Sequence, residues 1–110
     1  MAALDNVTDA TFEEKVFQAG RPVLVDFYAA WCGPCKGMVP ALEDLAREYT
    51  GEVDILVLDI DANRETAARY NVRGLPTFIL FKGEQVLEQV LGSTSRSRLA
   101  ASIEAALEQV

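Results

Sequence analysis

The chain has 110 residues, of which 50% are hydrophobic, and it carries a net charge of −7 with no histidine. This length and composition are typical of one globular domain with its own core, and they exclude a disordered chain. The acidic balance provides no basic surface for phosphates, so we expect no nucleic-acid partner and no helix lying on a membrane.

The sequence also shows no membrane or targeting segment. No apolar run approaches the roughly 18 residues that a membrane span requires. The first residues, 1–14, have neither the cationic start nor the long apolar run of a secretory signal. Two cysteines are too few for a secreted, disulfide-stapled domain. We therefore expect a cytoplasmic protein, or one in an organelle stroma or matrix if a transit peptide has been removed.

The N-terminal segment predicts a short strand followed by a helix. The strand is expected over residues 4–7, and the helix carries Phe12 and Val16 on its buried side. Thr8 or Asp9 is expected to cap this helix, because short oxygen-bearing side chains accept hydrogen bonds from free N–H groups at a helix start.

The middle of the chain predicts a strand–helix–strand unit. The apolar, β-branched runs 23–29 and 53–60 are typical of strands buried on both faces of a parallel sheet. A right-handed crossover joins such strands. The helix between them is indicated by apolar residues at helical spacing, namely Leu42, Leu45, Ala46 and Tyr49.

The last third predicts an antiparallel hairpin between two helices. A short helix is expected over 62–70, and strands over 76–82 and 85–91 flank a tight turn at Gly83. A final helix carries Leu99, Ile103 and Leu107 on one side. Together these elements predict one α/β domain over residues 1–110, with a mixed sheet and helices on both faces.

The cysteines and the tryptophan gather in one segment, AAWCGPCKGMVP at 29–40. Trp31 is the only tryptophan, and Cys32 and Cys35 are the only cysteines. The segment follows the strand 23–29, and catalytic sites of open α/β sheets usually lie at the carboxyl ends of strands. Two cysteines three apart in a first helical turn have Cα atoms about 5–6 Å apart, which suits a disulfide. We interpret the pair as a redox centre that cycles between dithiol and disulfide.

The two thiols are expected to differ in reactivity. Cys32 stands at the start of a helix, where free N–H groups and the helix dipole stabilise a thiolate. Lys36 adds positive potential, and Cys35 lies deeper in the helix and is expected to be less exposed. We therefore expect Cys32 to attack a substrate disulfide and Cys35 to resolve the mixed disulfide. Pro34 fits the first turn, because its missing N–H would have no intrahelical partner there.

Three other interpretations of the cysteine pair stay open at this point. A zinc site needs four ligands, so a chain with two cysteines and no histidine could form one only across a dimer, and we expect no metal. An inert structural disulfide would constrain little, since a three-residue loop removes little unfolded-state entropy. Two ordinary buried thiols would not explain why both flank Gly33 and Pro34 directly after Trp31.

Several motifs together resemble the thioredoxin family. WCGPCK at 31–36, the aspartate of VDFYA at 25–29, GLPT at 74–77 and the late Gly92 occur in the family's order and spacing over nearly the whole chain. The resemblance implies the thioredoxin fold, a mixed central sheet flanked by helices on both faces in a three-layer α/β/α sandwich. It also implies a dithiol–disulfide oxidoreductase that reduces protein disulfides and helps maintain cell redox homeostasis.

The resemblance further implies the cofactor requirement and the partners. No bound cofactor is expected, since the cysteines themselves carry the electrons. The partners are expected to be disulfide-containing target proteins and a separate thioredoxin reductase, NADPH- or ferredoxin-dependent, that recharges the pair. The protein is expected to act as a monomer.

The family's functional residues carry over to the matching positions of this chain. The resemblance implies that Cys32 attacks, that Cys35 resolves, and that Asp26 is a buried acid passing protons to or from Cys35. It also implies that Pro76 is a cis-proline facing the disulfide. A shallow, largely apolar docking surface is implied for Trp31, Gly33, Pro34, Gly74, Leu75, Pro76, Gly92 and Ser93.

Asp26 interrupts an apolar strand, and strand parity places it on the face of Leu24 and Tyr28. A carboxylate between two apolar faces is costly unless it is paired or neutral, so burial is expected to raise its pKa toward neutrality. It is then suited to acid–base work near neutral pH. The alternative is a polar residue at a solvated strand end.

Pro76 and Trp31 each have an ordinary structural interpretation as well. Pro76 opens a strand and on the residues alone would be trans, since only about 5–6% of X–Pro bonds in folded proteins are cis. The GLPT resemblance favours cis, which would leave Leu75 free to pair with an extended substrate segment. A lone tryptophan is usually a core residue, but the place of Trp31 beside Cys32 favours the rim of a site.

Some positions depart from the family pattern. The strand after Asp26 usually has a lysine beside it, and this chain has Val57, so we expect a higher Asp26 pKa than in relatives that keep the lysine. Tyr28 replaces a tryptophan often found there, and Gly37 a bulkier residue. Pro40 is expected to kink the active-site helix by removing one hydrogen bond.

Two other functions remain as alternatives. A disulfide oxidant or isomerase of this family usually has a histidine between its cysteines, whereas this chain has Gly33 and Pro34. A binding module with the same fold would clamp partners without redox turnover. The reduction potential tests the first alternative, and replacement of Cys32 by serine tests the second.

Overall fold

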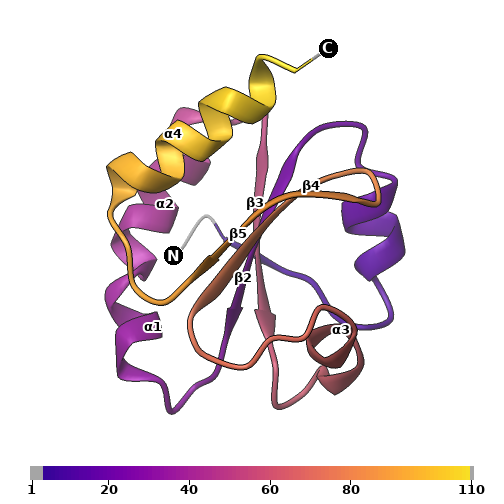
Figure 1. Cartoon of the computed structure of the whole chain (residues 1–110), viewed down its shortest axis with the longest axis vertical. Coiled ribbons are helices and arrows are strands. Elements are labelled where there is room, and N and C mark those ends of the chain that lie inside the picture. The colour runs from indigo at the N-terminus through magenta and orange to yellow at the C-terminus, as the bar shows by residue number, and fades with distance from the viewer. Residues whose placement is uncertain (1–3, 110) are drawn as a thin grey trace.

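A five-stranded mixed sheet forms the centre of the computed structural model, which describes residues 4–109 (Figure 1). The strand order is β1-β3-β2-β4-β5, with β1 and β2 parallel to β3, and with β4 antiparallel to both β2 and β5. The strands are β1 (Asp5–Asn6), β2 (Val23–Tyr28), β3 (Asp54–Asp59), β4 (Thr77–Lys82) and β5 (Gln85–Leu91).

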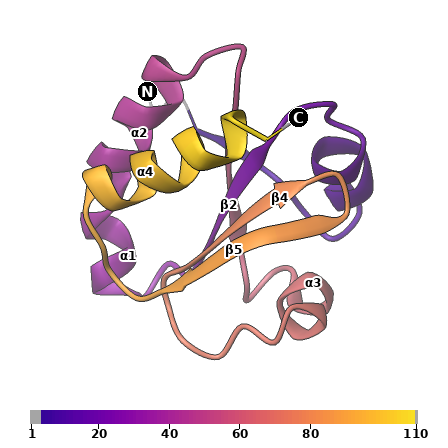
Figure 2. The same cartoon turned by 45° about the horizontal axis from the view of Figure 1, so that its top comes forward.

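Helices cover both faces of this sheet. They are the π-helix η1 (Glu13–Phe17) and the α-helices α1 (Gly33–Gly37), α2 (Val39–Glu48), α3 (Arg64–Arg69) and α4 (Arg96–Leu107). Figures 1 and 2 show α1, α2 and α4 on one side of the sheet and α3 on the other. The expected three-layer α/β/α sandwich is confirmed. Among the described residues, none of the helices has the length and apolar character needed to cross a membrane.

The central strand β2 explains the unbroken apolar run in the sequence. It has a neighbouring strand on each side and helices on each face, so both of its faces must be apolar. Val23, Val25 and Phe27 point to one core and Leu24 points to the other, as strand parity predicts. The edge strand β5 is mostly exposed or half-buried, as expected for a strand with one free side.

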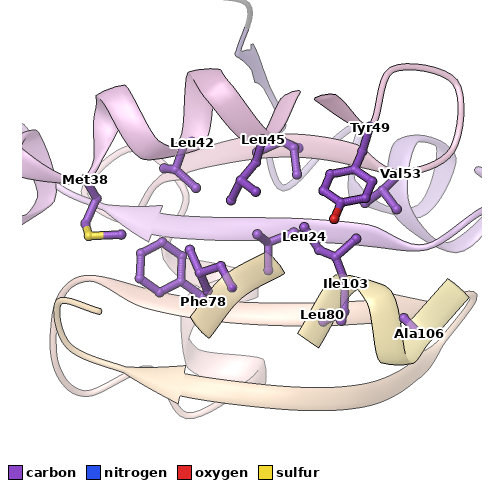
Figure 3. Packing of buried hydrophobic residues seen from close by; sticks show 12 residues of the cluster. Leu24, Met38, Leu42, Leu45, Tyr49, Val53, Phe78, Leu80, Ile103 and Ala106 are labelled. Carbon is purple, nitrogen blue, oxygen red and sulfur yellow. The ribbon is translucent and has the colours of Figure 1, made fainter. Parts of the chain in front are cut away.

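The larger core lies between the sheet and helices α2 and α4 (Figure 3). Leu42 and Leu45 of α2 are fully buried and face Leu24 of the sheet. Leu99 and Ile103 of α4 complete this layer, so the helical spacing seen in the sequence corresponds to the buried sides of both helices.

The second core lies under η1 and α3. Phe12 and Val16 pack there against Val25, Phe27 and Phe81. The rings of Phe12 and Phe81 meet edge to face at 5.4 Å between centroids. The predicted burial of Phe12 and Val16 is therefore confirmed, although the helix is a short π-helix that begins after Phe12.

The helix after Cys32 differs from the prediction of one helix kinked at Pro40. The chain instead forms two helices, α1 and α2, separated at Met38. Pro40 lies in the first turn of α2, where a proline removes no intrahelical hydrogen bond. The break therefore comes before the proline, and α2 starts at the residue that precedes it.

The predicted capping of the N-terminal helix by Asp9 is wrong, because Asp9 caps α3 instead. Its Oδ1 accepts hydrogen bonds from the N–H of Thr66 at 2.9 Å and from the Thr66 hydroxyl at 2.6 Å. Its Oδ2 accepts from the N–H of Glu65 at 3.2 Å. The other proposed cap, Thr8, accepts from the N–H of Thr11 at 3.2 Å, just before η1.

Leu42 and Leu91 offer a matched test of the larger core. We expect Leu42→Ala to lower the free energy of unfolding by about 2–5 kcal/mol, because it leaves a cavity in a fully buried layer. Leu91→Ala should change it by less than about 0.5 kcal/mol, since that side chain is 69% exposed. Denaturant unfolding of both variants measures this, and similar losses would contradict the assignment of the core.

Asp9 offers a test of the long-range cap. We expect Asp9→Ala to lower the free energy of unfolding by about 1 kcal/mol and to speed hydrogen exchange of the Thr66 amide. Glu84→Ala, in the exposed hairpin turn, is the control and should change neither quantity appreciably. Unchanged exchange at Thr66 in the Asp9 variant would show that the cap does not hold α3.

Candidate active site

The register of the sheet brings four chain segments to one edge, which is formed by the carboxyl ends of β2 and β3. β2 and β3 are parallel, so the residues after Tyr28 and after Asp59 emerge together. β4 runs the other way, and its first residue, Thr77, pairs with Phe27 of β2 and with Leu91, the last residue of β5. The Cys32 loop, the turn after β3, the residue before β4 and the residue after β5 therefore meet at this edge.

Cys32 and Cys35 are joined by a disulfide at this edge. Their Cα atoms lie 5.3 Å apart, within the separation that the sequence predicts. The pair lies between the end of β2 and the body of α1, as expected for a redox centre that opens and closes without large backbone movement.

Cys32 is the N-cap residue of α1, with extended backbone, and Pro34 occupies the first turn. The N–H of Cys35 donates a hydrogen bond to Sγ of Cys32 at 3.2 Å. This donor would also face a thiolate on Cys32, which favours the charged form. Cys32 is 5% and Cys35 3% exposed, so the predicted difference in exposure has the expected direction and is small.

Asp26 lies in the middle of β2 and is 2% exposed. In the sheet its register partners are Val57 on β3 and Phe78 on β4, both apolar. Within the described part of the chain, its Oδ1 has no hydrogen-bond partner. Burial raises the pKa of this carboxyl from 3.8 to about 7. The alternative of a solvated strand end is therefore wrong.

Asp26 and Cys35 line one pocket, called here the Asp26 pocket, of about 510 Å³. Helix α1 contributes Cys35 and Lys36, whereas α2 contributes Val39. Lys36 is exposed. The complete lining is Leu4, Asp26, Tyr28, Ala29, Ala30, Cys35, Lys36, Val39 and Val57.

A second hollow lies beside Cys32 and has a volume of about 410 Å³. It is called here the docking groove, after the docking surface that the resemblance implies. It contains six of the residues that the sequence places at the site, namely Trp31, Cys32, Gly33, Pro34, Gly74 and Leu75. Ile60, Val72 and Arg73 complete its lining and were not foreseen.

Trp31 stands at the rim of this groove and is 70% exposed, as its place beside Cys32 predicts. Its indole Nε1 donates a hydrogen bond to Oδ2 of Asp61 at 2.9 Å. Sequence reasoning missed Asp61, although one signal was available. Asp61 follows the carboxyl end of β3, which is parallel to β2, and the carboxyl ends of neighbouring parallel strands lie at one edge of a sheet.

Pro76 follows Leu75 through a cis peptide bond, as the resemblance implies, and it is buried. The N–H of Gly92 donates to the Pro76 carbonyl at 2.7 Å, with Gly92 at φ 90°, a backbone angle that favours glycine. Pro76 and Gly92 are thus neighbours, beside Gly74 and Leu75 of the groove. Ser93 is exposed, and among the described residues it is not part of the groove lining.

Leu91 is a further exposed apolar residue at this edge that the sequence did not single out. It is 69% exposed, and a Cβ built on Gly74 would lie 2.9 Å from Leu91 Cδ1. Glycine at position 74 therefore lets the leucine side chain lie close to the backbone beside the groove. The feature that could have pointed to Leu91 is its position at the exposed end of the edge strand, next to Gly92.

Within residues 4–109 no group of three or more His, Cys, Asp or Glu side chains is placed to hold a metal ion. The chain has no histidine, and its two cysteines are bonded to each other.

Comparison with known proteins gives a consistent result. A family model described as Thioredoxin matches residues 3–105. The thioredoxin of Pseudomonas aeruginosa is 49% identical over 91% of this chain and 93% of its own. Thioredoxin C-2 of Corynebacterium nephridii is 45% identical over 94% and 95%, and the thioredoxin of Synechocystis is 40% identical over 94% and 97%. The chain belongs to the thioredoxin family and is a dithiol–disulfide oxidoreductase.

Proposed function

We propose that this protein reduces disulfides in target proteins, with Cys32 as the attacking thiolate and Cys35 as the resolving thiol. The observation that carries this assignment is the hydrogen bond from the Cys35 N–H to Cys32 Sγ. It singles out Cys32 as the sulfur with a donor directed at it, and Cys32 also lines the docking groove. Cys35 instead lines the Asp26 pocket behind it.

The first step joins the protein to its target. The Cys32 thiolate attacks one sulfur of the target disulfide, a new S–S bond forms, and the other target sulfur leaves as a thiolate that takes a proton. Trp31, Pro34 and Leu75 offer apolar contacts beside Cys32, and the rest of the docking surface is Gly33, Gly74, Pro76, Gly92 and Ser93. Leu75, just before Pro76, supplies backbone for pairing with an extended target segment.

The second step releases the target. Cys35 gives up its proton, its sulfur attacks Cys32 Sγ, and the second target sulfur leaves and takes a proton. The target gains two electrons and two protons, and the protein ends with the Cys32–Cys35 disulfide. Asp26 is the proton acceptor for Cys35, because it lines the same pocket and its pKa of about 7 suits proton exchange at neutral pH.

The protein must then be reduced again, and we assign that step to a separate thioredoxin reductase. No bound cofactor is needed, since the sulfurs carry both electrons. We further propose a single thioredoxin domain over residues 1–110 that acts as a monomer in the cytoplasm and supports cell redox homeostasis. The single domain is supported by two cores that share one sheet. The cytoplasmic location is supported by the bacterial sources of the relatives.

Serine variants of the two cysteines test the assigned roles. With insulin as the target and dithiothreitol as the reductant, Cys32→Ser is expected to reduce disulfides no faster than dithiothreitol alone. Cys35→Ser should still attack but lack the resolving sulfur, so it should accumulate a mixed disulfide visible by mass spectrometry. A wild-type protein that reduces insulin no faster than dithiothreitol alone, and equals Cys32→Ser, would favour a binding module. A mixed disulfide trapped through Cys35 in the Cys32→Ser variant would reverse the two roles.

The raised pKa of Asp26 predicts a dependence of stability on pH. Its pKa is higher folded than unfolded, so its contribution to stability is complete below about pH 4 and is lost as the pH rises through about 7. The gap between 3.8 and about 7 corresponds to roughly 4 kcal/mol. Asp26→Asn cannot ionise at this position. Its free energy of unfolding, relative to that of the wild type, should therefore rise by roughly 4 kcal/mol when the pH is raised from 4 to 8.

Denaturant unfolding of the oxidised protein at both pH values measures this difference. Asp44→Asn on the exposed side of α2 is the control, because an exposed ion pair contributes little at either pH. A stability difference between wild type and Asp26→Asn that is independent of pH would show that Asp26 ionises normally in the fold.

A further inference from the structure

We propose that the Asp26 pocket binds a small primary ammonium ion with an apolar chain, held by the Asp26 carboxylate. The pocket lies on the α1–α2 side of the sheet and is separate from the docking groove, with which it shares no lining residue. The binding does not depend on the catalytic roles assigned above.

The first argument is the unpartnered oxygen of Asp26. The side chain is 2% exposed, it lines the pocket, and its Oδ1 has no hydrogen-bond partner among the described residues. A buried charged oxygen without a partner is costly, and a donor that reached it would recover that cost. An ammonium group supplies both a hydrogen-bond donor and the opposite charge.

The second argument is that the sheet provides no cation for this acid. Its register partners, Val57 and Phe78, are apolar, so the places beside Asp26 on both neighbouring strands lack a donor. Lys36 also lines the pocket, but it is exposed and forms no ion pair with Asp26 in the described part of the chain. Within the described residues, Asp26 therefore has no direct ion-pair partner.

The third argument is the shape and chemistry of the walls. Leu4, Val39 and Val57, with Ala29 and Ala30, make most of the lining apolar. The volume of about 510 Å³ lies within the range of about 300–1,000 Å³ typical of small-molecule sites. A short alkyl chain would cover these walls while the ammonium reached the carboxylate.

Other ligand classes fit the same features less well. A purely apolar ligand would leave Oδ1 without a partner, and an anion would meet a carboxylate. A metal ion needs several ligands, and within the described residues no suitable group of side chains gathers around Asp26. The combination of one carboxylate and apolar walls therefore selects an organic cation.

The test compares n-hexylammonium with 1-hexanol, which has a similar chain and no charge. The oxidised wild-type protein is titrated with each at pH 8, and methyl and amide NMR shifts are followed. We expect saturable binding of n-hexylammonium, at least tenfold tighter than of 1-hexanol, with the largest shifts at Leu4, Val39 and Val57. Equal affinities, or shifts spread over the acidic outer sides of the helices, would overturn the proposal.

Three variants locate the interaction. Asp26→Asn should remove the tenfold preference while 1-hexanol binding is kept, and Val57→Lys should block both probes by filling the pocket beside Asp26. Lys36→Gln is the matched control on the pocket wall and should bind n-hexylammonium at least as tightly as the wild type. If Asp26→Asn retains the preference, or if Val57→Lys binds as the wild type does, the ammonium is not held at Asp26.

Discussion

The burial of β2 on both faces is the constraint on which the rest of the structure depends. The strand pairs with β3 on one side and β4 on the other, and each face is covered by helices. Its side chains fill two cores at once, so a change in its register would expose both. Because the strand is held so firmly, the loop that follows it has a fixed starting point, and Cys32 is delivered to one place at the edge of the sheet.

The same constraint gives Asp26 its character. A carboxyl in a strand that is covered on both faces is largely shielded from water, and its neighbours in the sheet are Val57 and Phe78. Its pKa is raised by burial alone, without a carboxylate beside it to repel its charge. The feature that stabilises the fold, a central strand sealed from solvent, thus also produces an acid that exchanges protons near neutral pH.

The sequence predicts those parts of the fold that depend on local pattern. The strands, α2 and α4 were found because apolar spacing reports directly on which sides are buried, as for Leu42 and Ile103. The cysteine chemistry was predicted because both sulfurs lie within one short segment. The cap of α3 was not predicted, because Asp9 and Thr66 are 57 residues apart and only the packed chain brings them together. The bond between Trp31 and Asp61 also joins residues that only the packed chain brings together. The exposure of Leu91 depends on its place at the end of β5, the last strand in the order of the sheet.

Val57 connects stability with the chemistry of the site. A side chain that cannot pair with Asp26 leaves the ionised carboxylate uncompensated, so the fold is less stable whenever that group is charged. The lack of a side chain that pairs with Asp26 also keeps its carboxyl protonated up to about neutral pH, and it leaves a pocket open beside Cys35. An acid that was already paired with a cation would hold its charge at neutral pH and would be a weaker proton acceptor. The cost in stability and the readiness to take a proton therefore have one physical origin, an unpaired carboxyl in an apolar strand.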